Sequence, residues 1–166
     1  MALEGYQKLE ENQTVELKET KGGLPKSLWE TYSSFSNTCG GTIYLGIAEK
    51  KIKPNDISGV SNPSELIKDL FASARNQGKV NKCFLREDDV NVVSTPLGNI
   101  VEIVVREAPR REKPIYLNRN LAMSYVHYRD GDHLATASEI KSMVVDNGET
   151  SYDLLPQPDG LWLRRG

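Results

Sequence analysis

A helix end, two glycines and a strand follow one another without a linker at residues 35–47, and this run constrains the fold most. The apolar residues that lead into it recur at the spacing of one helical face, at Leu28, Tyr32 and Phe35. Gly40 and Gly41 can adopt positive φ, which the reversal from a helix into a strand often requires. Residues 42–47 are apolar, β-branched and aromatic, as in a buried central strand. The run therefore predicts a helix that turns sharply into the middle of a sheet.

The rest of the chain alternates between patterns typical of strands and of helices. Residues 14–19 alternate apolar and polar side chains and predict a first strand. An Asn-Pro-Ser-Glu and a Thr-Ala-Ser-Glu sequence predict helices that start near residues 62 and 136. Further strands are predicted at 90–93, 100–105, 115–117 and 123–128. This order predicts an α+β fold, with a mixed, mostly antiparallel sheet of about five to seven strands and about three helices.

Length and composition indicate one soluble domain. The chain has 166 residues, enough for a single core, and we predict a domain at 1–148 followed by a tail at 149–166. Hydrophobic residues make up 38% and charged residues 27% of the chain, which is ordinary for a globular protein. The apolar runs are too short to span a membrane, and the N-terminus does not resemble a signal peptide. We therefore expect a cytoplasmic protein without a membrane partner.

Charge and cysteine content narrow the function classes. The formal net charge is −2, whereas a dedicated nucleic-acid binder is usually basic, so any contact with nucleic acid must come from a local patch. Cys39 and Cys83 form neither a zinc motif nor a disulfide framework, and we expect two reduced thiols. The sequence contains no G-x-x-x-x-G-K-[ST] motif and so predicts no ATPase activity.

Two charged residues of the first predicted strand indicate metal chemistry. Glu16 and Lys18 are two residues apart, so their side chains share one face of the strand. A Glu-x-Lys pair on one face occurs in many metal-dependent nucleases, where the carboxylate holds a cation and the lysine positions or activates water. Glu11 has the wrong parity for this face and can join it only if the chain bends. Glu49 follows the strand at 42–47 and can converge with Glu16 if the two strands are neighbours.

Two interpretations of these acidic residues stay open. If Glu11, Glu16 and Glu49 come together, their carboxylates form a site suited to Mg²⁺ or Mn²⁺. If they do not, they are exposed charges at strand ends with structural uses.

A second group of charged residues lies between positions 106 and 129. We predict that five of its cations contact nucleic acid, namely Arg106, Arg110, Arg111, Lys113 and Arg129. Interleaved tyrosines support this prediction, because cations beside aromatic rings suit a groove that holds phosphates and stacks unpaired bases. Glu107 and Glu112 dilute the charge, and the alternative is a solvated loop of mixed charge.

Residues 129–132 are typical of a turn built around Gly131. Arg129 can meet a phosphate or pair with a neighbouring aspartate, Asp130 or Asp132. His127 and His133 have no partner at metal-ligand spacing, so structural or surface roles are favoured over metal binding.

Four stretches, in the same order, resemble the Schlafen Alba-like domain. Residues 35–47 are similar to its A-F-A-N-T and G-G-x-I-x-x-G-V signature, and residues 11–18 to its E-x4-E-F-K motif. Residues 125–140 and 151–156 resemble its Y-V-R-x-G-S-S-T and S-[FYW]-D-x-x-P motifs, so the resemblance covers residues 9–156. The domain occurs in prokaryotic proteins catalogued as transcriptional regulators or divergent AAA proteins, and in the N-terminal core of animal Schlafens. The resemblance implies the α+β fold of that family.

The resemblance also implies a metal centre. In some Schlafens, the glutamates of E-x4-E-F-K and an acidic residue after G-V form a metal-dependent ribonuclease centre that acts on tRNA-like substrates. Carried over residue by residue, the motif implies Glu11 and Glu16 as catalytic metal ligands beside Lys18. The third position departs from the pattern, because Gly-Ile-Ala-Glu49 stands where the family commonly has G-V-D-D or G-V-x-D.

The predicted function is nucleic-acid binding, with RNA favoured over DNA. In its sharper form, the protein is a metal-dependent endoribonuclease for structured RNA such as tRNA, in which Glu11, Glu16 and Glu49 hold Mg²⁺ or Mn²⁺ and Lys18 takes part in catalysis. One alternative is a non-catalytic DNA-binding module of a transcriptional regulator, and another is an interaction domain such as half of a homodimer. Relatives often carry a larger C-terminal region, so the resemblance leaves open whether the chain is a fragment.

Overall fold

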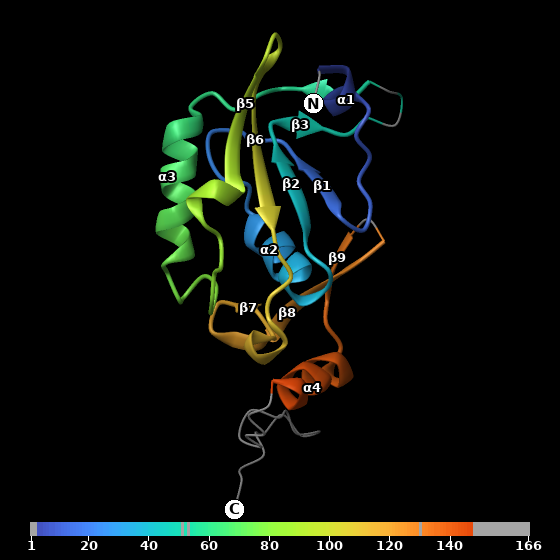
Figure 1. The fold of residues 1–166 in the computed structure, drawn as a ribbon, viewed down its shortest axis with the longest axis vertical. Helices are drawn as coiled ribbons and strands as arrows, with labels where there is room; N and C mark the ends of the chain where they lie inside the picture. The colour runs from blue at the N-terminus through green and yellow to red at the C-terminus, as the bar shows by residue number, and fades with distance from the viewer. Residues whose placement is uncertain (1–2, 51, 53, 130, 148–166) are drawn as a thin grey trace, which may run out of the picture.

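The computed structural model describes residues 3–50, 52, 54–129 and 131–147 (Figure 1). The predicted tail at 149–166, with its motif at 151–156, lies outside these residues. None of the described helices combines the length and the apolar character that crossing a membrane requires.

A four-stranded sheet forms the centre of the fold, in the order β1-β2-β6-β5. Its strands are β1 (Val15–Lys18), β2 (Gly41–Leu45), β5 (Val90–Thr95) and β6 (Gly98–Val105). β1 runs parallel to β2, and β6 pairs antiparallel with both β2 and β5. The strand after the two glycines is therefore an inner strand, and β1 is its neighbour at the edge of the sheet (Figure 1).

Two smaller sheets complete the strand pairing. One joins β3 (Ile47–Ala48) to β4 (Asp56–Ile57), and the other contains β7 (Tyr116–Leu117), β8 (Asn120–Tyr128) and β9 (Gly131–Leu134). The predicted α+β class with mostly antiparallel pairing is confirmed. The strands are divided among three sheets rather than one because α2 (Leu28–Asn37) lies between the central sheet and β8. One side of α2 joins the core of the sheet, and Asn37 Nδ2 donates to Tyr125 O of β8 at 2.9 Å.

The described residues form four α-helices and two short 3₁₀ turns. The helices are α1 (Leu3–Gln7), α2, α3 (Pro63–Ala74) and α4 (Ala137–Asp146), and the 3₁₀ turns are Glu87–Asp89 and Arg110–Glu112. The predicted starts of α3 and α4 are confirmed. Asn62 Oδ1 accepts a hydrogen bond from Glu65 N at 3.3 Å, and Thr136 and Glu139 cap α4 reciprocally.

Helix α1 is an element for which the sequence pattern of residues 1–12, which is mostly polar, gives no prediction. Tyr6 is 2% exposed, and its ring meets that of Tyr44 edge-on, with centroids 6.0 Å apart. A five-residue helix is too short to show a periodicity in the sequence, and packing against the sheet is what stabilises it.

Gly40 makes the sharp reversal between α2 and β2. Its φ is 71°, and its N–H donates to Phe35 O at 2.8 Å, which closes the end of the helix. A Cβ at this position would lie 2.7 Å from Val105 O of β6. Both the backbone conformation and the close approach of β6 therefore require glycine.

The two faces of the central sheet carry separate hydrophobic cores. Ile43 and Leu45 of β2 pack with α2 and α3 on one face, whereas Tyr44 packs with α1 and β3 on the other. The register pairs Glu16 with Ile43 and Lys18 with Leu45. Because paired residues point to the same face, Glu16 and Lys18 lie on the side of the sheet that α2 covers.

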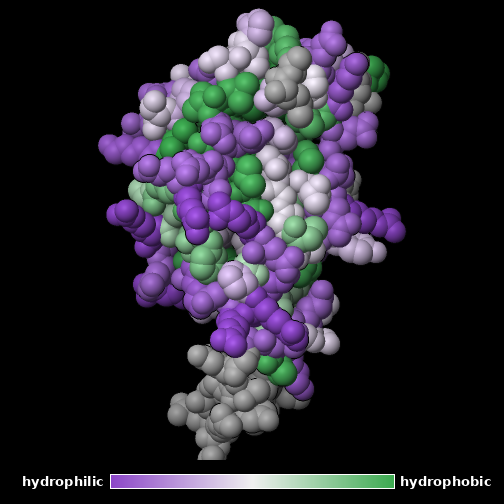
Figure 2. Space-filling model, in the orientation of Figure 1, coloured by the Kyte–Doolittle hydropathy of each residue, from purple (hydrophilic) through white to green (hydrophobic). Residues whose placement is uncertain are grey.

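Hydrophilic side chains cover most of the face drawn in Figure 2, and hydrophobic ones surface only in separate patches. The large hydrophobic residues that are more than half exposed are Ile52, Leu97, Tyr128 and Leu134. Scattered apolar residues of this kind are normal on a soluble surface. This face therefore offers a partner mainly polar contacts.

Candidate metal centre at the edge of the central sheet

Glu16 and Lys18 lie together under α2 and are largely buried. Lys18 Nζ is 3.6 Å from Glu16 Oε1 and donates a hydrogen bond to Ser27 Oγ at 2.7 Å. Only 12% of the Glu16 side chain and 9% of the Lys18 side chain is exposed. The two side chains share a face, as the sequence predicts, and they are not solvent-exposed charges at the end of a strand.

The surroundings of Glu16 destabilise the charged form of its carboxyl. Burial raises its pKa to about 7; Lys18 opposes this shift, and Glu11 and Asp132 add to it. Its Oε2 atom is buried and has no hydrogen-bond partner among the described residues. An unpartnered buried oxygen of this kind costs free energy, which a cation beside it would offset.

The chain makes the bend that Glu11 needs to reach this edge. Asn12 pairs with Val15 across a tight turn, and Asn12 N donates to Val15 O at 3.1 Å. The turn carries Glu11 back along the outer edge of β1, where its Oε1 accepts a hydrogen bond from Leu17 N at 3.4 Å. Glu11 is thereby close enough to Glu16 to raise the pKa of that carboxyl.

Glu49 reaches the same edge from the end of β3. Its Oε2 accepts a hydrogen bond from Glu11 N at 2.5 Å, and its side chain is exposed. Glu11 is therefore in contact with both Glu49 and β1. β1 and β2 are neighbours, as the predicted convergence of Glu49 with Glu16 requires, and the contact that Glu49 makes is with the backbone of Glu11.

Two residues that the sequence did not join to Glu16 lie beside it. His127 is buried, with Nδ1 2.9 Å from Asp132 Oδ1 and Nε2 2.8 Å from Asn12 O. Thr31 Oγ1 of α2 donates to Asp132 Oδ2 at 2.5 Å. Glu16, His127 and Asp132 each offer one ligand atom, and these atoms lie within 4.8 Å of one another. Within the part of the chain that the structure describes, no other group meets this condition.

Two of the three residues, His127 and Asp132, could have been paired from the sequence. His127 lies directly opposite Asp132 in the β8–β9 hairpin, across the turn that Gly131 indicates. Treating residues 125–134 as a hairpin would have paired the two side chains. The approach of Glu16 depends on how β8 packs against α2, and no local pattern carries that information.

The donor set fits a hard divalent cation. Glu11, Glu16 and Glu49 supply carboxylate oxygens, the ligand type that Mg²⁺ and Mn²⁺ prefer. The unpartnered Oε2 of Glu16 is an atom that such a cation would satisfy. Glu11 and Glu49 lie outside the compact group of three ligand atoms, and their role as ligands stays a prediction.

Most of the predicted nucleic-acid contacts already face acidic partners. The ion pairs are Arg106 with Asp89, Arg110 with Asp146, and Lys113 with Glu107. Arg110 has 75% of its side chain exposed, and Arg111 is exposed beside it. Arg110 and Asp146 form an exposed pair, which is weak, so a phosphate can replace Asp146, whereas Asp89 and Lys113 are largely buried in their pairs. The role of these cations in binding stays a prediction.

Arg129 lies over an exposed aromatic ring. Its guanidinium carbon is 5.6 Å from the ring centroid of Tyr128, which is 61% exposed. Asp132 bonds to His127 and Thr31 instead of to Arg129, and Asp130 lies outside the described residues. Contact of Arg129 with a phosphate and its pairing with Asp130 both stay predictions.

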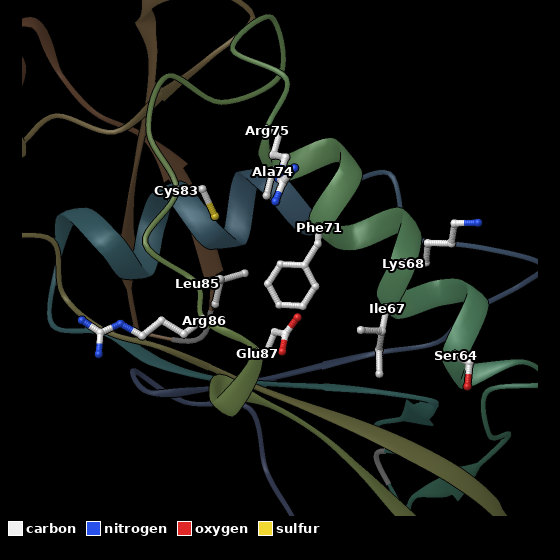
Figure 3. Close-up of a pocket in the computed structure, with 10 residues that line it drawn as sticks. All are labelled: Ser64, Ile67, Lys68, Phe71, Ala74, Arg75, Cys83, Leu85, Arg86 and Glu87. Atoms are coloured by element: carbon white, nitrogen blue, oxygen red, sulfur yellow. The ribbon is translucent and has the colours of Figure 1, made fainter.

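A cavity of about 740 Å³ lies elsewhere in the fold, between α3 and the segment at 83–87. The ring of Phe71 points from α3 toward Leu85 and Glu87 inside it (Figure 3). Lys68, Arg75 and Arg86 also line it, although none of the charge patterns in the sequence indicated this site. It does not include any of the residues around Glu16.

Comparison with known proteins gives a family and two similar folds. The family model of Schlafen, AlbA_2 matches residues 11–138. The N-terminal domain of a protein related to the ATP-dependent DNA helicase RecG, from Nitrosomonas europaea, is 20% identical, with a TM-score of 0.61 over 82% of this chain and 92% of that chain. The DIP2311 protein from Corynebacterium diphtheriae is 16% identical, with a TM-score of 0.52 over 85% of this chain and 25% of that chain. No curated protein matches.

At these identities the two structures support the fold alone, and the family match carries the assignment. The matched segment, residues 11–138, contains β1, α2, β2 and the β8–β9 hairpin. It therefore includes Glu11, Glu16, Glu49, His127 and Asp132. Because the match covers well over half of the sequence, the chain belongs to the Schlafen AlbA_2 family.

Proposed function

We propose that the protein binds nucleic acid and cleaves it as a divalent-metal-dependent endonuclease, with structured RNA such as tRNA as the substrate. The observation that carries the proposal is the buried carboxylate of Glu16, whose Oε2 has no partner among the described residues while Lys18 is fixed beside it. The family assignment and the helicase-related name of the Nitrosomonas protein support nucleic acid as the partner. We propose RNA rather than DNA because residues 11–18 resemble the E-x4-E-F-K motif of Schlafen ribonuclease centres.

Each residue of the centre has a proposed role. Glu16, Glu11 and Glu49 hold Mg²⁺ or Mn²⁺, and the ion supplies charge neutralisation at the phosphate and an activated water. Lys18, which Ser27 holds in place, orients the scissile phosphate or the attacking water. Arg106, Arg110, Arg111, Lys113 and Arg129 bind the flanking phosphates.

The test is cleavage of end-labelled tRNA, single-stranded DNA and duplex DNA with Mn²⁺ or with EDTA. We expect discrete RNA fragments with Mn²⁺ and none with EDTA. Glu16→Gln keeps the shape of the side chain and should reduce the rate by at least about a hundredfold. Glu19→Gln, an exposed residue just beyond β1, is the matched control and should cleave like the wild type. Intact RNA and DNA in every lane would refute the nuclease proposal.

A second candidate is a non-catalytic module that binds single-stranded nucleic acid, or that acts as one half of a homodimer. The pair formed by Arg129 and the exposed ring of Tyr128 favours binding, because a cation on an aromatic face can stack an unpaired base. This candidate predicts gel shifts that weaken with salt and no turnover. A dimer that ignores nucleic acid would instead give a doubled mass in solution without any gel shift.

A further inference from the structure

We propose that Glu16, His127 and Asp132 form a mixed nitrogen and oxygen site that binds a divalent first-row transition ion such as Mn²⁺ in preference to Mg²⁺. The inference deepens the proposed function and rests on it for the role of Glu16. It differs in assigning His127 and Asp132 as ligands. It concerns metal binding, which can be measured without cleavage.

The ligand atoms already lie near the separation that a metal requires. The three side chains come from β1, β8 and β9, and one ligand atom of each lies within 4.8 Å of the other two. Metal–ligand bonds of about 2.0–2.2 Å hold neighbouring ligand atoms about 3–4 Å apart, so small side-chain movements would close the site.

Each of the three side chains has a contact with a residue outside the group. His127 Nε2 faces Asn12 O at 2.8 Å, which leaves Nδ1 facing Asp132 Oδ1 at 2.9 Å. Thr31 Oγ1 donates to Asp132 Oδ2. Such outer contacts orient the ligands in metal sites and fix the histidine tautomer.

Glu16 completes the set in the same way. Its Oε1 lies 3.6 Å from Lys18 Nζ, whereas its buried Oε2 has no partner in the described residues. Glu16, which has one oxygen without a partner in the described residues, therefore belongs to the same group of potential ligands as His127 and Asp132.

Packing and charge both favour a bound cation here. The ring of Phe35 lies against the imidazole of His127, with centroids 4.6 Å apart, and this contact restricts the orientation of the imidazole. Glu11 and Asp132 raise the pKa of Glu16 electrostatically, whereas Lys18 and His127 lower it. The imidazole explains the preference, because nitrogen ligands favour transition ions over Mg²⁺.

The direct test is Mn²⁺ binding to the 166-residue chain after EDTA treatment, followed by electron paramagnetic resonance and calorimetry. We expect one Mn²⁺ per chain in the wild type and weaker competition by Mg²⁺ at the same concentration. Asp132→Asn and His127→Gln should each weaken Mn²⁺ binding at least about tenfold. His133→Gln, the other histidine of the hairpin, is the control and should bind Mn²⁺ like the wild type.

Circular dichroism and thermal unfolding show whether a variant that binds Mn²⁺ weakly is still folded. Asp132→Asn is the variant least expected to disturb the fold, because it changes the shape of the side chain least. A wild-type chain that does not bind Mn²⁺, or Mn²⁺ binding that survives both Asp132→Asn and His127→Gln, would overturn the site. Mn²⁺ binding that depends on Asp132 without any cleavage would retain the site and refute the nuclease. Cleavage that depends on Glu11 and Glu49 but not on Asp132 would support the nuclease and overturn the site formed by Glu16, His127 and Asp132.

Discussion

Glu16 is a carboxylate that the fold places where its charged form is costly. It is largely buried, one oxygen lacks a partner among the described residues, and Lys18 and, more weakly, His127 offset its charge. Its pKa is raised to about 7, chiefly by burial. A group of this kind is stabilised either by a proton or by a cation, and functional sites often contain such groups.

The raised pKa predicts how stability depends on pH without divalent metal. The carboxyl binds its proton more tightly in the folded state than in the unfolded state, where the pKa is in the usual range for glutamate. The free energy of unfolding therefore falls as pH rises from the unfolded pKa to about 7, and it levels off above that value. We expect a fall of about 2 kcal/mol, allowing for solvent screening, in urea titrations of the wild type in EDTA.

Glu16→Gln should remove most of this fall, because glutamine carries no charge at any pH. The variant should then be more stable than the wild type at about pH 8. Glu19→Gln, at an exposed position, should keep the pH profile of the wild type. Parallel profiles for the wild type and Glu16→Gln would contradict the assignment of the raised pKa to Glu16.

Helix α2 is the element that joins the two halves of the candidate centre. Its buried polar side supports the sheet that contains β8 and β9, because Asn37 Nδ2 donates to both Ile115 O and Tyr125 O at 2.9 Å. Asn37 Oδ1 accepts from Ile115 N at 2.8 Å. The opposite side of α2 packs on the central sheet that carries Glu16. The distance between Glu16 and the β8–β9 hairpin is therefore fixed through one helix.

Asn37→Ala tests this connection. The change removes the Asn37 hydrogen bonds of Tyr125 O, Ile115 N and Ile115 O, of which Ile115 O keeps the bond from Ser33 Oγ. We therefore expect a loss of about 3 kcal/mol in the free energy of unfolding, measured by urea denaturation. Asn91→Ala, the same change at an exposed position of β5, should shift it by no more than about 0.5 kcal/mol. Equal losses in the two variants would show that Asn37 does not hold the sheets together.

The elements that the sequence predicts are those whose signals are local. The caps at Asn62 and Thr136 and the glycine reversal at Gly40 each depend on residues within a few positions, and all three are confirmed. Helix α1 and the division into three sheets depend on packing between distant segments, and the sequence did not predict them. The candidate centre follows the same division. The shared face of Glu16 and Lys18 was predictable, whereas the approach of His127 was not.

At the scale of the whole molecule, two groups of cations are candidates for binding nucleic acid. One group, at residues 106–113, lies in ion pairs with neighbouring acids. The other lines the cavity between α3 and the segment at 83–87. With a formal net charge of −2, the chain can attract nucleic acid only through such local groups.

The salt dependence of nucleic-acid binding shows which of the two groups of cations contacts the nucleic acid. If the segment at 106–113 holds the nucleic-acid backbone, the double variant Arg110→Ala and Arg111→Ala should weaken binding and reduce the slope of log K against log salt by about 1 to 2. The double variant Lys68→Ala and Arg75→Ala removes the same charge at the cavity and should leave the slope unchanged. A reduced slope in the Lys68→Ala and Arg75→Ala variant alone, measured in filter-binding titrations, would show that nucleic acid binds at the cavity instead.

The hydrogen bond between His127 Nε2 and Asn12 O has a consequence for the order of folding, because it joins positions 115 residues apart. Contacts that close such long loops form late, after the local turns and hairpins. During synthesis from the N-terminus, β1 and β2 are complete long before β8 leaves the ribosome. Until then Glu16 has no hairpin to cover it, so the centre is one of the last parts of the protein to acquire its final surroundings.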